Sequence, residues 1–495
     1  MNSLAVAIFV VFVAATLAIT YWSSRRATSM TDFYAAGGCI KPWQNGLAIA
    51  GDYLSAASFL GTVSVFFSFG LDGLLYAVGA AAGWPVVTCL VAERLRRLGH
   101  HTFSDVLCHR LGGKPLRAMT AVTTLCICGM YLVSQMVGAG TLVQVLFHVP
   151  YAYAVTMVGV LMTVYVMFGG MVATTWIQIV KATILIAGGA FMGFLVLRHY
   201  AFDSSALLAA AASTRSDPSS LLLPSGLMKD PMSAISLALA FSLGPGGMPH
   251  VLMRFFTVKD GAAARRSLIY GSSVIAGFQA IVVLLGFGAI ALVTNDPQFR
   301  DANGALIGGA NVAAVYLSYE LGGSILFGVV AAVTFATILA VVSGVTLAAA
   351  QAISHDLFKE VFTSGSADQA SEVRVSKAAT GVIGAASIGL GLLFQHQNIG
   401  FLATLPLVIA ASANFPILLL AMYWPGLTRR GATAGGITGL TLSVGLMIAS
   451  PKVWSGALGL SNPPFPYEYP TLISTGAAFI VAWLISVADA GATRS

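Results

Sequence analysis

Long apolar runs are the feature of this sequence that most constrains its fold. Thirteen of them reach the length of about 20 residues with which a helix crosses a bilayer, and they lack the periodicity of half-buried strands or helices. Only 9% of the residues are charged. The sequence therefore predicts an all-α polytopic membrane protein with about 13 transmembrane helices in a lipid bilayer. The spans are expected at residues 2–22, 44–69, 72–92, 117–146, 150–168, 173–197, 232–253, 267–293, 324–352, 377–394, 399–424, 432–450 and 471–489.

The distribution of Lys and Arg predicts how these spans are oriented. The first span has no basic residue before it and is followed by Arg25 and Arg26, so it lacks the basic region of a cleaved signal peptide. Loops after odd-numbered spans, together with the carboxyl tail, hold 19 basic residues, whereas the opposite side holds five. Because basic loops stay in the cytoplasm, we expect an external amino terminus and a cytoplasmic carboxyl terminus, in a bacterial cell inner membrane.

The loops offer no sign of an enzyme or of a second domain. None of them reaches the roughly 50 residues of a small soluble domain. Hydrolytic triads, phosphate-binding glycine loops and metal-ligand spacings do not stand out in them. We therefore expect one membrane domain, residues 1–495, with no enzymatic activity, no cofactor, no nucleic-acid partner and no obligate protein partner.

Two of the predicted spans are interrupted by glycine, proline and polar residues. The second reads NGLAIAGDYLSAASFLGT, and the seventh contains FSLGPGGMPH at residues 241–250. The two spans lie five apart in the chain, so they cross the membrane in opposite directions. Close helix packing explains one such interruption, but a matched pair is typical of inverted repeats whose first helices are discontinuous and enclose a site.

Two charged residues fall inside the spans. Asp52 is the only carboxylate well within them, and a charge there costs about 3 kcal/mol. It is expected to attract or hold a cation beside carbonyls that the break frees, unless it reaches the cytoplasmic interface. Lys181 either extends to that interface or faces a cavity, where it would pair with an anionic solute or titrate in place of a bound cation.

The interrupted spans also suggest what kind of solute the site could hold. Free N–H groups and the positive dipole end at the start of a half-helix favour a carboxylate. Glycines would allow the solute to approach the backbone closely, and hydroxyl and amide groups would donate hydrogen bonds to it. Tyr131 and Gln135, four residues apart on the fourth span, could equally form hydrogen bonds between helices. The predicted substrate-binding residues are Ser55, Ser58, Thr62, Tyr131, Gln135, Gly244, Gly246 and Gly247.

Several segments resemble a known family. FSLGPGGMPHVLMRF, YVMFGGMVATTWIQIVKA and SHDLF resemble the sodium/solute symporter family, and DFYAAGG with NGLAIAGDYLSAASFLGTVS is most similar to its acetate permease branch. The resemblance extends over roughly residues 30–450. It implies a single membrane transport domain with a LeuT-like fold of two inverted five-helix repeats. In this sequence the parts would be an extra first helix at 1–22, repeats at 44–197 and 232–424, and two additional helices at 432–489.

The resemblance also implies cation-driven symport by alternating access, with acetate or another short monocarboxylate as the solute. Proton coupling instead of sodium coupling, and a different small organic solute such as proline, remain as alternatives. A channel is less expected, because a channel would need a continuous polar lining or a ring of charges.

For the sodium site of the family, the resemblance points to the first broken helix and the ninth span. The first would supply backbone carbonyls, and its carboxylate at Asp52 matches a position of the family's proline transporters. The cation-binding residues implied are Ala50, Gly51, Asp52, Tyr53, Leu54 and Thr337.

The sequence departs from the family pattern at this site. The paired hydroxyl ligands of the family fall on Ala340 and Val341, which have no side-chain oxygen, so only Thr337 remains. The family's aspartate in the TWxD stretch is Gln178, and Lys181 follows one turn later. Gln178 and Lys181 are therefore candidates for coupling, and either Na⁺ or H⁺ could be the coupling ion.

Overall fold

The computed structural model describes residues 3–24, 40–98, 103–167, 171–223, 227 and 230–492. Within these ranges all regular secondary structure is helical. The only strand-like pairing there is an isolated bridge between Arg300 and Leu306. The all-α prediction is therefore confirmed for this part of the chain. The DFYAAGG motif and the Arg25–Arg26 pair lie outside the described residues.

The helices that correspond to the predicted spans have bounds that differ from them mostly by a few residues. They are α1 (Ser3–Ser24), α3 (Pro42–Tyr53), the π-helical η2 (Ala57–Gly61), α4 (Thr62–Phe69), α5 (Gly73–Leu90), α8 (Lys114–Phe147), α9 (Tyr151–Met167), α10 (Met171–His199), α13 (Pro231–Leu243), α14 (Pro249–Met253), α15 (Gly261–Val293), α16 (Ala313–Gln351), α17 (Gln369–Leu393), α18 (Ile399–Ile409), η9 (Ala410–Asn414), α19 (Phe415–Tyr423), α20 (Arg429–Ile448) and α22 (Thr471–Ala492).

Local signals explain where several of these helices begin. The carboxylate of Asp230 accepts a hydrogen bond from the backbone N–H of Ser233, and Pro231 occupies the first position of α13. Asp260 caps α15 in the same way through the N–H of Ala263. Both caps satisfy N–H groups that have no partner inside the helix.

The number of spans is lower than predicted when each helix is judged by length and composition alone. Among the described residues, nine helices are long and apolar enough to cross a membrane, or ten if the bent pair Pro231–Gly247 and Pro249–Thr257 counts as one span. Residues 57–90 form a single stretch of this kind, although they cover parts of two predicted spans. The count of thirteen therefore stays a prediction.

The loop predicted between residues 294 and 323 is partly helical, contrary to expectation. α16 begins at Ala313, and its two parts meet at Gly322 and Gly323, which have non-helical backbone angles. Gly323 has a φ of 59°, a conformation that glycine adopts without strain. Because residues 313–317 are apolar or aromatic and buried, the chain packs them as a short helix before it turns into the span.

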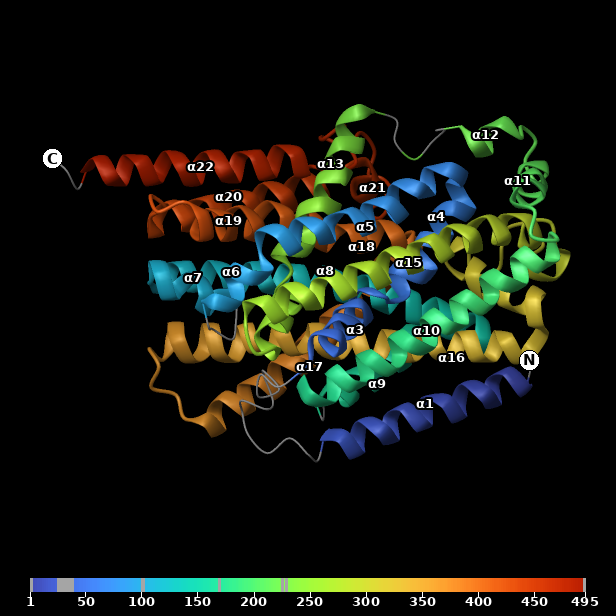
Figure 1. Ribbon diagram of the computed structural model, residues 1–495, viewed down its shortest axis with the longest axis horizontal. Helices are drawn as coiled ribbons and strands as arrows, with labels where there is room; N and C mark the ends of the chain where they lie inside the picture. The colour runs from blue at the N-terminus through green and yellow to red at the C-terminus, as the bar shows by residue number, and fades with distance from the viewer. Residues whose placement is uncertain are drawn as a thin grey trace.

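The helices lie side by side along the long axis of the molecule (Figure 1). α1 starts at one end of this axis and α22 finishes at the other. The basic α6 (Ala92–Arg97) and α7 (Phe103–Leu111) lie at the end where α22 finishes, and α11 (Ser204–Ser213) and α12 (Ser219–Leu222) lie at the opposite end. The chain therefore crosses the long dimension of the bundle an odd number of times.

Glycines allow the interrupted helices to approach their neighbours closely. A Cβ atom placed on Gly83 of α5 would lie 2.1 Å from the carbonyl oxygen of Phe241 on α13. A Cβ atom on Gly51 of α3 would lie 2.5 Å from the carbonyl oxygen of Gln178 on α10. Since backbone atoms cannot move aside as a flexible side chain can, both contacts require glycine.

Gly83→Ala should therefore destabilise the protein. The added methyl group would push α5 away from α13 at the second interruption, and overpacking of this kind costs about 1–3 kcal/mol. Gly129→Ala in α8 is the matched control, because nothing lies within 4 Å of its Cβ position. Thermal unfolding of the purified protein in detergent should show a lower Tm for Gly83→Ala than for Gly129→Ala. Equal melting temperatures would contradict the contact.

Candidate functional site

The first interruption separates α3 from η2. Leu54 leaves the helical conformation, with φ −72° and ψ 86°. The N–H of Ser55 then donates to Oγ of Ser58 at 2.8 Å, and the N–H of Ala57 donates to Oγ of Ser55 at 3.2 Å. The two serine hydroxyls therefore replace backbone partners that the break removes, which is required at bilayer depth.

The second interruption separates α13 from α14. Gly244–Gly247 form a 3₁₀ turn, Met248 is extended, and the two helical parts are bent by 41° at the break. The predicted contact of these glycines with a solute stays a prediction, and their Cα atoms lie close to neighbouring helices. A Cβ atom on Gly244 would lie 2.8 Å from the carbonyl oxygen of Leu407, and one on Gly247 would lie 2.4 Å from that of Ala410. These glycines face the neighbouring α18 and η9.

A buried ion pair connects the two interrupted helices. Nε of Arg254 lies 2.6 Å from Oδ2 of Asp52, and Nη2 lies 3.2 Å from Oδ1. The side chains of Arg254 and Asp52 are only 2% and 6% exposed. Both carboxylate oxygens are thus engaged by a guanidinium, so Asp52 is paired with Arg254 and does not reach the cytoplasmic interface.

Polar contacts next to the ion pair strengthen the same connection. Asn45 on α3 donates from Nδ2 to the carbonyl oxygen of Arg254 at 3.0 Å. Thr257 donates from Oγ1 to Oδ1 of Asn45, also at 3.0 Å. The short segment η5 (Arg254–Thr257) is therefore held against α3 by both charged and neutral hydrogen bonds.

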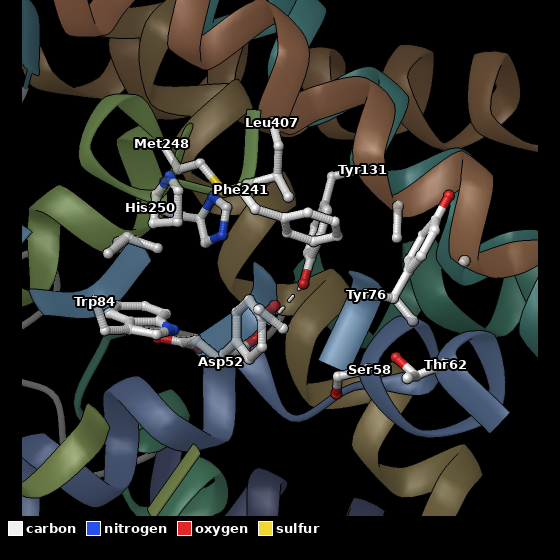
Figure 2. A pocket seen from close by; sticks show the side chains of 17 residues that line it. Asp52, Ser58, Thr62, Tyr76, Trp84, Tyr131, Phe241, Met248, His250 and Leu407 are labelled. Carbon is white, nitrogen blue, oxygen red and sulfur yellow. Dashed lines mark hydrogen bonds between the residues drawn. The ribbon is translucent and has the colours of Figure 1, made fainter. Parts of the chain in front are cut away.

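A small cavity lies between the two interruptions (Figure 2). The centre of a water molecule can occupy about 40 Å³ of this cavity. Its walls are mostly aromatic and aliphatic, with a few polar groups. The lining residues are Asp52, Tyr53, Ala57, Ser58, Thr62, Tyr76, Ala80, Trp84, Tyr131, Phe241, Pro245, Met248, His250, Val251, Gly400, Ala403 and Leu407.

Only some of the predicted substrate residues reach this cavity. Ser58, Thr62 and Tyr131 line it, as do Asp52 and Tyr53 from the predicted cation set. The others lie outside its lining. Ser55 and Gln135 contact each other, with 3.5 Å between Nε2 of Gln135 and Oγ of Ser55.

The remaining cation and coupling candidates meet on the other side of α3. Gln178 donates from Nε2 to the carbonyl oxygen of Ala340 at 3.1 Å, while its own backbone packs against Gly51. The ammonium of Lys181 donates to the carbonyl oxygen of Thr337 at 3.2 Å, and this side chain is buried. Lys181 therefore faces α16 in the interior and does not extend to the membrane surface.

Three residues of the site were not found by sequence reasoning. Arg254 lies one position beyond the apolar window that ends at residue 253, so the sequence predicts it in a basic loop. The sequence does contain a signal for this ion pair: an arginine directly follows one interrupted span, and the other interrupted span contains a single carboxylate. Trp84 and His250 are apolar or aromatic members of their helices in sequence, and no pattern showed that they face a cavity.

The fold and the comparisons together define a class of protein. The arrangement is that of multi-pass transporters, and the profile of the sodium:solute symporter family matches residues 33–439. The chain belongs to this family. The members of this family and the structural relatives below are transporters, not enzymes. Membership in a family of sodium:solute symporters supports cation-coupled symport of a small solute.

Solved structures of transporters share the fold at low sequence identity. A Na⁺-coupled sialic acid symporter in its substrate-bound outward-open state has a TM-score of 0.74 and 16% identity, over 98% of this chain and 97% of its own. Mhp1, a nucleobase-cation-symport-1 family transporter in a closed conformation with bromovinylhydantoin, has a TM-score of 0.57 and 12% identity, over 93% and 94%. A manganese transporter from Eremococcus coleocola has a TM-score of 0.50 and 15% identity, over 93% and 97%.

The ion pair makes a quantitative prediction. Asp52→Asn and Arg254→Gln should each destabilise the protein strongly, because removal of one partner of a buried pair leaves an unpaired charge and costs about 3–5 kcal/mol. The double substitution should be milder than the sum of the single ones, since no unpaired charge is left. A double-mutant cycle on thermal unfolding in detergent measures this difference, and strict additivity would contradict the pairing.

Proposed function

We propose that the protein takes up acetate or another short monocarboxylate by cation-coupled symport with alternating access, as in the acetate permease branch of its family. One observation supports this most: the small cavity between the interrupted helices has apolar walls and uncharged hydrogen-bond donors, and its only carboxylate is already neutralised by Arg254. An anionic solute would therefore not meet an unpaired negative charge on entry.

The size of the cavity favours a very small solute. One bound water molecule requires about 10–15 Å³ of space that a water centre can occupy. The cavity has about 40 Å³ of such space, which is room for about three waters or for a solute of a few heavy atoms. Acetate and its nearest homologues fit this description better than proline, which remains the alternative solute class.

The proposal includes the arrangement of the chain in the membrane. We expect thirteen helices, two inverted five-helix repeats at residues 44–197 and 232–424, and a discontinuous first helix in each repeat. The ends of α1 and α22 at opposite ends of the bundle support an odd number of crossings (Figure 1). With the arginine-rich α6 in the cytoplasm, the amino terminus would lie outside a bacterial inner membrane.

The geometry around α16 favours the proton as the coupling ion. The ammonium of Lys181 already supplies a positive charge at the carbonyl oxygen of Thr337. Ala340 and Val341 offer no hydroxyl ligands, and both oxygens of Asp52 are engaged by Arg254. In the proposed cycle Lys181 would release its proton towards the cytoplasm and regain it from outside.

Sodium is the second candidate for the coupling ion, and family membership favours it. Its ligands would be carbonyl groups at the end of α3 and Thr337, whose hydroxyl donates to its own helix at the carbonyl of Val333 and keeps lone pairs available. The carbonyls would come from Ala50, Gly51, Tyr53 and Leu54.

Uptake of labelled acetate into proteoliposomes tests the proposal. An imposed proton gradient without sodium should drive uptake, and Lys181→Met should reduce it to the level of empty liposomes while leaving acetate exchange at equal pH intact. Lys377→Met, on the exposed surface of α17, is the matched control. Uptake that depends on a sodium gradient at fixed pH would replace the proton with sodium.

Competition by unlabelled solutes in the same assay tests the solute class. Propionate, glycolate and pyruvate should compete with acetate, each less well as its size or polarity increases. Strong competition by proline, with none by any of these monocarboxylates, would overturn the proposed solute.

A further inference from the structure

Two side-chain nitrogens that can donate hydrogen bonds lie in the cavity wall without a protein partner. Nε1 of Trp84 is fully buried, and Nδ1 of His250 belongs to a side chain that is 7% exposed. Neither atom has a hydrogen-bond partner among the residues that the structure describes. Both side chains line the same cavity between the interrupted helices.

Two such atoms in one cavity are unusual. Buried indole and imidazole groups normally find a partner, because a buried polar atom without one destabilises the protein. An indole N–H can only donate, so its partner has to be an acceptor. Since the surrounding protein supplies none, the acceptor must enter the cavity.

Tyr131 adds a third donor at the same place. Its ring stacks on the imidazole of His250, with 5.2 Å between the centroids and 26° between the planes. Its hydroxyl has only long contacts of 3.5 Å, to Oγ of Ser55 and to the carbonyl oxygen of Asp52. Figure 2 shows Trp84, His250 and Tyr131 around the part of the cavity next to Asp52.

The charges near these donors are already balanced. Arg254 engages both oxygens of Asp52 and is itself absent from the cavity wall. Arg254 also follows His250 by four residues, so both side chains lie on one side of the same short segment. The ion pair therefore fixes the position from which His250 faces the cavity.

We propose that Trp84 and His250 bind the carboxylate of the transported solute, each by one hydrogen bond, from Nε1–H and Nδ1–H respectively. A carboxylate accepts only, so it matches the indole N–H of Trp84 and the tautomer of His250 that carries its proton on Nδ1. The methyl end of the solute then lies against Phe241 and Leu407, on the apolar part of the wall. This inference rests on the proposed transport of a monocarboxylate.

Four variants in proteoliposomes test it by acetate exchange at equal pH and equal sodium, where the driving ion does not limit the rate. Trp84→Phe keeps an aromatic ring beside Tyr53 but removes the N–H, and His250→Phe removes the imidazole donor. His250→Asn restores an N–H donor close to the position of Nδ1. Trp43→Phe is the matched control, because Trp43 is 48% exposed on α3 and does not line the cavity.

Loss of one hydrogen bond to a charged group should raise the KM for acetate by roughly ten- to a hundred-fold in Trp84→Phe and in His250→Phe. His250→Asn should recover most of the affinity, and Trp43→Phe should match the unmodified protein. Acetamide is a neutral molecule of the same shape as acetate. Its ability to inhibit exchange of labelled acetate should differ less between the donor variants and the unmodified protein than that of unlabelled acetate. If the variants simply folded less well, inhibition by acetate and inhibition by acetamide would decrease to the same extent.

The outcomes separate this inference from the proposed function. If the unmodified protein exchanges acetate and both donor variants keep its KM within two-fold, the inference is wrong and the function stands. If the protein transports proline, the same variants should raise the KM for proline, because it too carries a carboxylate. Transport of a solute without a carboxylate would overturn both the inference and the proposed solute.

Discussion

The structure depends on how two helix breaks are stabilised away from water. At bilayer depth every freed backbone group and every charge needs a partner within the protein. Ser55 and Ser58 supply partners at the first break, and the ion pair between Asp52 and Arg254 joins that break to the second. The glycines of the second break then pack on α18 and η9. The cavity is the space that remains between these fixed contacts.

The last turn of α3 is shared by two regions with different chemistry. Asp52 and Tyr53 line the cavity, while Gly51 packs against Gln178, which with Lys181 donates to carbonyl groups of α16. In the proposed cycle, a change in protonation or cation occupancy near α16 would act on the same helical turn that borders the cavity. This shared turn would then connect the two proposed sites.

The fold class could be predicted from the sequence, and residues of both interrupted spans line the cavity of the candidate site, but the partners of individual side chains could not be predicted. Apolar length predicted the helices, and glycine and proline inside two spans predicted where polar groups would meet. Arg254 was missed because the apolar window ended at residue 253, and the helix at 313–321 because a loop was assumed to end where the long span began. Trp84 could not be found, since its membrane helix is apolar all round and gives no sign of which face meets a cavity. His250 belongs to the interrupted stretch at residues 241–250, but the sequence does not show which side chains of that stretch face the cavity.

The central claim is that the solute binds between the two breaks, with its carboxylate on donors of the cavity wall. Solid-state NMR on the protein in lipid, with ¹³C in the carboxyl group of acetate and ¹⁵N in the indole nitrogens, tests it directly. Seven tryptophans are present, so Trp84→Phe is needed to assign the signal. We expect a short ¹³C–¹⁵N contact in the unmodified protein that disappears in Trp84→Phe. Bound acetate without such a contact, or with a contact that persists in Trp84→Phe, would contradict it.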